Sequence, residues 1–384
     1  MPIPSHRHVD VAIVGGGVIG LSIAWELAQR NLGVSVLDQG PMGKAASWAG
    51  AGILPPPPGA RADHPLDALA RRSRELHPMW AQRLIELTGI DNGYHVCGGL
   101  YLAQTPGEMA SLIANRANWT DEGLQVQEWS KEQIIAKEPH LVSAVEAGRV
   151  KKAFWMAEEA QLRNPHHLQA LEAACQLSNV QLRPHAPVTH LERSGRKWSL
   201  RTDQDHLSAD KVCLAAGAWT ALLTKSVGFE PAVVPVRGQM RLYRTDSSVL
   251  SSILNEGPRY LVPRKDGLIL AGSTEEDAGF NDSTTSDGLQ SLQAFSEKWL
   301  PSLTPERCVQ SWAGLRPGTV DGFPYMGPVP EREGLFVAAG HFRNGLCLST
   351  GSAELMADLI TDQIPKIKAT PFQIQRGLHL DPKS

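Results

Sequence analysis

The feature that most constrains this chain is the glycine-rich segment GGGVIG at 15–20, which separates a predicted strand from a predicted helix. The short apolar run at 9–14 is typical of a buried strand. Residues 18–29 place apolar side chains at helical spacing, and 34–37 form a second apolar run. This order predicts a strand, a helix and a parallel second strand, joined by a right-handed crossover.

The three glycines of a GxGxxG segment have separate tasks in a dinucleotide-binding fold. Gly15 would make the tight turn, Gly17 would let the backbone approach a pyrophosphate, and Gly20 would let the helix pack close to the strand. Asp38 ends the second strand eighteen residues after Gly20, close to the spacing of about 20 expected for an acid that binds a ribose hydroxyl. A turn that only packs a helix is the simpler reading, but the full context favours a dinucleotide without a 2′-phosphate.

A run of very small residues follows this unit at 45–53 and extends the predicted site. Ala46, Ser47, Ala51 and Gly52 leave room for a ligand to approach the backbone closely, and the run ends at Ile53. A flexible linker is the alternative, but alanine, tryptophan and isoleucine are poor linker residues. We therefore expect this run to contact the pyrophosphate and flavin side of a long cofactor, which favours FAD over NAD.

The distribution of patterns along the 384 residues predicts two domains. Nucleotide-fold patterns stand at both ends, β-rich sequence lies between them, and four prolines at 55–58 predict an exposed, extended connector. The predicted class is α/β, with a discontinuous Rossmann-like FAD-binding domain of the glutathione-reductase type and an α+β substrate domain that has a mixed, largely antiparallel sheet. The predicted ranges are 1–90, 146–222 and 308–384 for the cofactor domain, and 91–145 and 223–307 for the substrate domain.

Composition restricts the partners and the compartment. The formal net charge is −3, so the chain has no large excess of positive charge with which to bind a phosphate backbone. Nucleic acid is therefore not predicted as a partner. The apolar stretch at 11–28 contains Glu26 and lacks a framed cleavage site, so neither a membrane span nor a signal peptide is expected. The five cysteines are scattered, without metal-binding spacing; this indicates free thiols in the cytoplasm and no metal site.

Several longer segments together resemble one enzyme family. WAGLRPGT at 312–319, DGFPY at 321–325 and GHFRNG at 340–345 occur in the same order as in the flavin amine oxidoreductases, as do VPRK at 262–265 and the small-residue run. That family includes D-amino acid oxidase, sarcosine oxidase and glycine oxidase. The likeness spans nearly the whole chain, and it implies non-covalent FAD, a homo-oligomer, and a substrate domain that covers one face of the flavin.

The resemblance and the glycine motif together predict a set of cofactor contacts. A small-residue turn at Gly217 and Val188 are expected beside the cofactor. The predicted FAD-binding residues are Gly15, Gly17, Val18, Ile19, Gly20, Asp38, Gln39, Ala46, Ser47, Ala51, Gly52, Ile53, Val188, Gly217, His341, Phe342, Arg343, Asn344, Gly345 and Leu346.

Three residues are predicted to position the substrate. Arg316, in the WAGLRPGT segment, would fork onto a carboxylate and remain charged at any working pH. The family resemblance implies that Tyr260 lines the pocket and donates its hydroxyl to the same carboxylate, and that Arg343 reaches the amine side or the flavin carbonyls. Each could instead be structural. In the family a methionine lines the pocket shortly after the strand that follows the VPRK turn, whereas this chain has Glu275 and Glu276 in that region. Glu275 could repel a carboxylate side chain or bind a cationic amine if it faces the pocket, which leaves the substrate open.

These observations predict oxidative deamination of a small amino acid, with glycine favoured and sarcosine or small D-amino acids retained. A hydride would pass from the α-carbon to flavin N5, giving an imine or glyoxylate and H2O2, with a role in thiamine thiazole synthesis implied by the resemblance. One alternative is a D-amino acid or proline dehydrogenase that uses an acceptor other than O2. A nicotinamide dehydrogenase, and a flavin-binding module of an assembly such as a tRNA-modification enzyme, also stay open.

Overall fold

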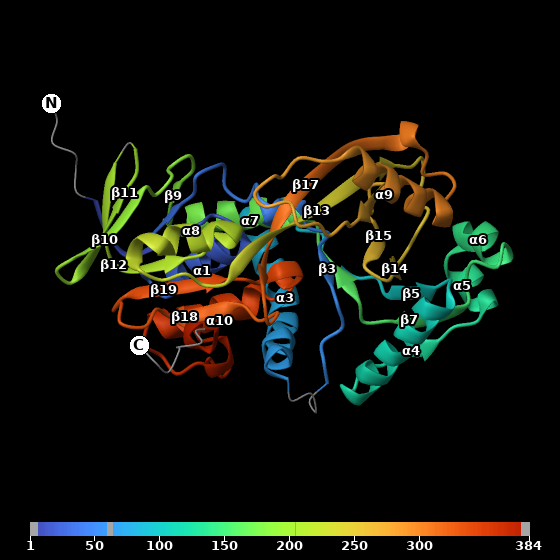
Figure 1. Ribbon diagram of the computed structural model, residues 1–384, viewed down its shortest axis with the longest axis horizontal. Helices are drawn as coiled ribbons and strands as arrows, with labels where there is room; N and C mark the ends of the chain where they lie inside the picture. The colour runs from blue at the N-terminus through green and yellow to red at the C-terminus, as the bar shows by residue number, and fades with distance from the viewer. Residues whose placement is uncertain (1–6, 60–63, 204, 378–384) are drawn as a thin grey trace.

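The computed structural model describes residues 7–59, 64–203 and 205–377, and its two large sheets occupy opposite ends of the molecule (Figure 1). The first sheet has eight strands in the order β10-β11-β12-β1-β2-β9, with β19 beside β12 and β18 beside β19. These strands are β1 (Arg7–Val14), β2 (Val34–Leu37), β9 (Gln181–Arg183), β10 (His190–Ser194), β11 (Lys197–Arg201), β12 (His206–Leu214), β18 (Tyr325–Pro328) and β19 (Leu335–Ala339).

The centre of this sheet is parallel, as the sequence predicts. Strand β1 pairs in parallel with β12 and β2, β2 pairs with β9, and β12 pairs with β19. Three helices pack on this sheet: α1 (Val18–Gln29), α7 (Asn164–Leu177) and α10 (Ser349–Ile360). Helix α3 (Pro65–Thr88) packs in turn on α7 and α10. Helix α3 runs without a break although Pro78 lies inside it. The Rossmann-like α/β class is therefore confirmed.

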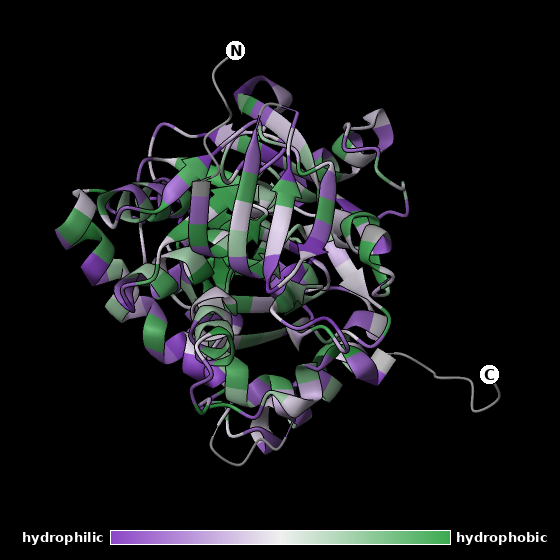
Figure 2. Cartoon of the chain, turned by 90° about the vertical axis from the view of Figure 1, so that its left-hand side faces the viewer, coloured by the Kyte–Doolittle hydropathy of each residue, from purple (hydrophilic) through white to green (hydrophobic). Residues whose placement is uncertain are grey.

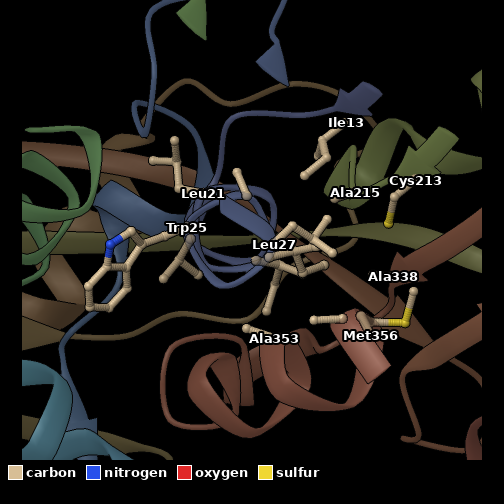
Figure 3. Close-up of a cluster of buried hydrophobic side chains, with 14 of the residues drawn as sticks. Ile13, Leu21, Trp25, Leu27, Cys213, Ala215, Ala338, Ala353 and Met356 are labelled. Carbon is tan, nitrogen blue, oxygen red and sulfur yellow. The ribbon is translucent and has the colours of Figure 1, made fainter. Parts of the chain in front are cut away.

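A cluster of buried apolar side chains holds the strand before the glycine-rich turn and the helix after it. Ile13 of β1 and Leu21 and Trp25 of α1 lie in one cluster with Ala353 and Met356 of α10 (Figure 3). Because each of these side chains is almost completely removed from water, the cluster contributes strongly to stability, at about 25 cal/mol per Å² of apolar surface. The start of α1 is thereby held rigidly against the sheet.

The second sheet also has eight strands, in the order β17-β13-β16-β15-β14-β5-β7-β6, and it is antiparallel except for the parallel pair β14 and β5. This confirms the mixed, largely antiparallel sheet. Its strands are β5 (Gly99–Ala103), β6 (Gln127–Glu128), β7 (Lys152–Met156), β13 (Val233–Arg244), β14 (Ile253–Glu256), β15 (Arg259–Pro263), β16 (Leu268–Gly272) and β17 (Cys308–Thr319).

Shorter elements complete the fold around the two sheets. Strands β3 (Ile53–Leu54), β4 (His95–Val96) and β8 (Ala160–Gln161) form a small third sheet. The remaining helices are α2 (Ala46–Ala49), α4 (Pro106–Asp121), α5 (Lys131–Lys137), α6 (Val142–Glu146), α8 (Thr220–Thr224) and α9 (Ser286–Trp299). In Figure 2 hydrophobic colour gathers towards the interior, and polar colour is frequent on the outer strands and helices. Within the described part of the chain, no helix combines the length and apolar character needed to cross a membrane.

Three local predictions differ from the structure. Strands β7 and β17 fall in ranges predicted for the cofactor domain, yet each pairs along its length with a strand of the second sheet. The two-domain division stays a prediction, and its outermost residues lie outside the described ranges. Pro56 is buried rather than part of an exposed connector. The pair Asn164-Pro165 is typical of a helix cap followed by the first helical residue, but Asn164 is itself the first residue of α7, and its side chain donates to the backbone of Ser47.

Candidate functional site

A cavity of about 510 Å³ lies where the two large sheets meet. One side is formed at the carboxyl ends of parallel strands, where Val14, Leu37 and Ala339 line it. Open parallel sheets bind ligands at this edge. The other side is formed by the faces of β13, β15 and β17. The structure thus brings the predicted cofactor residues and the predicted substrate residues to one continuous space.

Of the residues predicted to form the site, all but Gly20 line this cavity. They are Gly15, Gly17, Val18, Ile19, Asp38, Gln39, Ala46, Ser47, Ala51, Gly52, Ile53, Val188, Gly217, Tyr260, Arg316, His341, Phe342, Arg343, Asn344, Gly345 and Leu346. Gly20 lies behind the turn, where a β-carbon would stand 1.9 Å from the carbonyl oxygen of Gly15. Its role is the close packing of helix on turn. The individual contacts to a cofactor stay predictions.

The turn into α1 requires glycine because of its backbone angles as well as its packing. Gly15 has φ of +114°, a region that side chains with a β-carbon rarely adopt. A β-carbon there would also meet the carbonyl oxygen of Ala215 at 2.3 Å. The first turn of α1 therefore reaches the cavity with its backbone N–H groups and the positive end of its dipole, an arrangement that suits phosphate groups.

Asp38 is tied into this turn by two backbone hydrogen bonds. Its carboxylate accepts from the N–H of Gly16 at 2.7 Å and from the N–H of Gly40 at 2.8 Å. Burial raises the pKa of Asp38, although these hydrogen bonds and nearby His185 lower it. The carboxylate lines the cavity and has further lone pairs with which it could accept hydroxyl groups of a ribose.

The small-residue run is anchored to both α1 and α7. The hydroxyl oxygen of Ser47 accepts from the N–H of Val18 at 2.9 Å, and the Nδ2 of Asn164 donates to the carbonyl oxygen of Ser47 at 2.7 Å. The Oδ1 of Asn164 is buried in the cavity wall and has no hydrogen-bond partner among the described residues. A polar ligand could satisfy that acceptor.

Arg316 projects from β17 towards the segment that directly follows β16. Its Nη2 donates to the hydroxyl oxygen of Ser273 at 2.8 Å, and its Nη1 donates to the carbonyl oxygen of Thr274 at 3.2 Å. Burial lowers the pKa of Arg316, and nearby Arg343 adds to this effect. A guanidinium nonetheless stays charged in proteins. Two of its five donors are used here, and others can face a carboxylate in the cavity.

Tyr260 of β15 lies beside Arg316 and lines the same cavity. Its hydroxyl makes a long contact of 3.6 Å to the sulfur of Met240. Thioethers are weak acceptors, so this hydroxyl can turn readily to a better acceptor such as a substrate carboxylate.

The GHFRNG loop closes one wall of the cavity and contributes one charge. His341 is buried and pairs with the hydroxyl of Ser352 at 3.1 Å. Burial lowers the pKa of His341 to about 3, so it is neutral at physiological pH and has a structural role. Arg343, within η5 (Phe342–Asn344), forms an ion pair with Glu275.

Cys347 belongs to the loop before α10, which begins at Ser349. Its thiol donates to the carbonyl oxygen of Asn344 at 3.2 Å. Burial raises the pKa of this thiol to about 12, which keeps it protonated and unreactive.

Two features of the site were missed at the sequence level. Gly238 of β13 lies against Arg316, because a β-carbon there would stand 2.2 Å from both Nη atoms. Trp312 packs edge-on against Trp48 at 5.1 Å between centroids, and its indole N–H donates to the carbonyl oxygen of Ala49 at 3.1 Å. An isolated glycine inside a strand pattern marks a close approach of this kind, so Gly238 carried a readable signal.

Comparison with known proteins agrees with this geometry. A family model described as FAD dependent oxidoreductase (DAO) matches residues 10–359. A glycine oxidase of Pseudomonas putida is 40% identical over 94% of this chain and 97% of that protein. The crystal structure of glycine oxidase from Geobacillus kaustophilus matches with a TM-score of 0.89 at 34% identity, covering 97% of this chain and all of that one.

A third similarity is to part of a longer protein. A bifunctional protein ThiO/ThiG of Synechocystis is 34% identical over 96% of this chain, which spans 54% of that protein. The resemblance thus extends over the glycine turn, the small-residue run and the Arg316 strand in one order. The chain belongs to the DAO family of FAD dependent oxidoreductases.

Proposed function

We propose that this protein catalyses FAD-dependent oxidative deamination of a small amino acid, with glycine as the preferred substrate. The observation that carries the proposal is the position of Arg316 and Tyr260 on the wall opposite the glycine turn, within one cavity. Glycine is favoured because the full-length relatives named above are glycine oxidases. The net reaction is glycine + O2 + H2O giving glyoxylate, NH3 and H2O2.

The residues of the cavity fit FAD at both of its ends. The first turn of α1 would hold the pyrophosphate, Asp38 would accept ribose hydroxyls, and the loop His341–Leu346 would lie along the flavin. The chemistry that FAD would supply when bound is that of a hydride acceptor for the substrate α-carbon.

The protein's own contribution is positioning. Two N–H groups of Arg316 bind the substrate carboxylate, and the hydroxyl of Tyr260 donates to the same group. This fixes the α-carbon relative to the opposite wall of the cavity. Hydride loss needs the neutral amine, and His341, the only histidine among the described residues that line the cavity, is occupied with Ser352. The amine is therefore expected to lose its proton to water before oxidation.

Reduction of the bound flavin under anaerobic conditions tests the proposal. The purified protein should show flavin absorption, and glycine should bleach it faster than sarcosine, D-alanine or D-proline at equal concentration. Rapid return of the colour on admitting air supports an oxidase, whereas slow return points to an electron acceptor other than O2. Flavin bands that none of the four compounds changes would refute the proposed substrate class.

We also propose a cellular setting for this reaction. A role in supplying the thiazole of thiamine is favoured by the family resemblance and by the similarity to the ThiO/ThiG protein. A reducing cytoplasm is favoured by five free cysteines, of which Cys175 and Cys213 are buried in the first sheet region. A homo-oligomer is proposed from the resemblance, and sedimentation of the FAD-loaded protein tests it.

A further inference from the structure

An ion pair stands at the edge of the cavity and is not needed for the proposed reaction. The Nε of Arg343 donates to the Oε2 of Glu275 at 3.1 Å, and its Nη2 contacts the same oxygen. The two side chains come from different loops, one after β16 and one before α10. They are 31% and 50% exposed, so the pair lies at the rim rather than in the core.

The neighbouring carboxylate is committed elsewhere. Glu276 bonds the guanidinium of Arg237 and accepts from the Nε2 of Gln239 at 2.6 Å. Of these two adjacent acids, Glu275 is therefore the one that acts on the cavity. Both members of this ion pair act electrostatically on Arg316 inside the cavity: Arg343 lowers its pKa and Glu275 raises it, after the larger effect of burial.

The three charged side chains at this end of the cavity leave a net positive charge that one substrate carboxylate would neutralise. Arg316 and Arg343 are positive and Glu275 is negative, which leaves one positive charge for a ligand. A substrate with a single carboxylate matches it through Arg316. A second carboxylate would find Arg343 already paired and would face the negative charge of Glu275, and such a mismatch selects between ligands.

We propose that Glu275, by holding Arg343, makes the cavity selective for amino acids with one carboxylate and excludes amino dicarboxylates. The inference rests on the proposed function for its substrate class and adds the determinant of charge selectivity. It assigns Glu275 a specificity role and leaves carboxylate binding to Arg316. A variant that lacks the Glu275 carboxylate should therefore admit amines that carry two carboxylates.

Binding to the FAD-loaded enzyme tests this without turnover. Acetate and malonate differ by one carboxylate, and their dissociation constants are measured by calorimetry. Glu275→Gln keeps the side-chain shape but frees the charge of Arg343. We expect the preference for malonate over acetate to rise about fivefold, since rim charge pairs contribute about 1 kcal/mol. The rise should shrink at high salt.

Two further variants separate the causes. In Glu275→Gln/Arg343→Gln the gain should disappear, because the freed charge is removed as well. Asp277→Asn removes an exposed carboxylate two residues along the same segment and should leave the preference unchanged. A parallel turnover test compares iminodiacetate with sarcosine, which differ by the same carboxylate, and the ratio of their kcat/KM values should follow the binding preference.

The outcomes divide cleanly. An unchanged malonate preference in Glu275→Gln overturns the inference, as does a gain that survives in the double variant or appears equally in Asp277→Asn. Failure of glycine to reduce the flavin refutes the proposed function instead. The acetate and malonate measurements do not depend on that reaction, so the two failures are distinguishable.

Discussion

The two walls of the cavity are built by different means. The wall at the first sheet is shaped by main-chain packing, because Gly15 on its surface and Gly20 directly behind it bring main-chain atoms closer together than a β-carbon would allow. The wall at the second sheet presents side chains from pleated strands, with Arg316 and Tyr260 on its face. A backbone wall suits a cofactor that is the same in every turnover, whereas a side-chain wall can be changed to suit a substrate. Substitutions should therefore have separable effects on the two walls.

The largest expected effect is on the backbone wall. Gly20→Ala places a β-carbon 1.9 Å from the carbonyl oxygen of Gly15, and neither the turn nor α1 can shift without disturbing the core. We expect a loss of about 4 kcal/mol of unfolding free energy, together with loss of bound FAD. Denaturant titration and flavin absorbance measure both. Gly107→Ala is the control, because nothing lies within 4 Å of its added carbon; an equal loss there would contradict the argument.

On the side-chain wall, Arg316→Lys should leave the fold and FAD content intact. A lysine cannot offer the forked pair of N–H groups and cannot keep both contacts to Ser273 and Thr274. We expect kcat/KM for glycine to fall about 10²-fold, because lysine keeps the positive charge but displaces the bound carboxylate by about 1 Å. Steady-state peroxide production measures it. A fall of less than tenfold would mean that another group holds the carboxylate.

Buried ionisable groups predict a pH dependence that differs between the two walls. Burial lowers the pKa of His77 to about 4 and of His167 and His341 to about 3, all beside the first sheet. Each binds a proton more readily when unfolded, so its stabilising contribution falls as pH drops from about 6.5 towards these values. Beside the second sheet, burial raises the pKa of Glu159 to about 7, which has the opposite sign.

With three histidines opposed by one carboxyl, the unfolding free energy should fall by about 3 kcal/mol per pH unit between pH 6 and 5. Urea titrations across this range measure the slope. His341→Gln should reduce the slope by about 1.4 kcal/mol per pH unit. An unfolding free energy that instead rises as the pH drops in the parent protein would show that these histidines are protonated in the folded state, because only the effect of Glu159 would then remain.

A smaller effect is expected from the same glycine-to-alanine change on the side-chain wall. In Gly238→Ala the three atoms nearest to the added carbon all belong to the guanidinium of Arg316, and that flexible side chain can move away. We expect the melting temperature to stay within a few degrees, while kcat/KM falls about 10²-fold because the anchor is displaced by about 1 Å. If Gly238→Ala instead unfolds the protein as Gly20→Ala does, the distinction between the walls is wrong.

Much of the site could be read from the sequence because its residues are local in the chain. The glycine turn, Asp38 at the end of the next strand, and the WAGLRPGT and GHFRNG segments each carry a short-range pattern. The assignment of Asn164 as a helix cap failed because a local pattern competed with a distant partner. Its side chain bonds the backbone of Ser47, 117 residues away, and no window around α7 contains that information.

The sequence by itself determined the family, the Rossmann-like class and the identity of the residues around the cavity, because strand and helix periodicities and glycine requirements are properties of neighbouring residues. Tertiary structure alone decided the ion pair of Glu275 with Arg343, the close contact of Arg316 with Gly238, and the membership of β7 and β17 in the second sheet. These depend on contacts between segments far apart in the chain. Such contacts are set by packing and charge in the folded molecule, which no local pattern encodes.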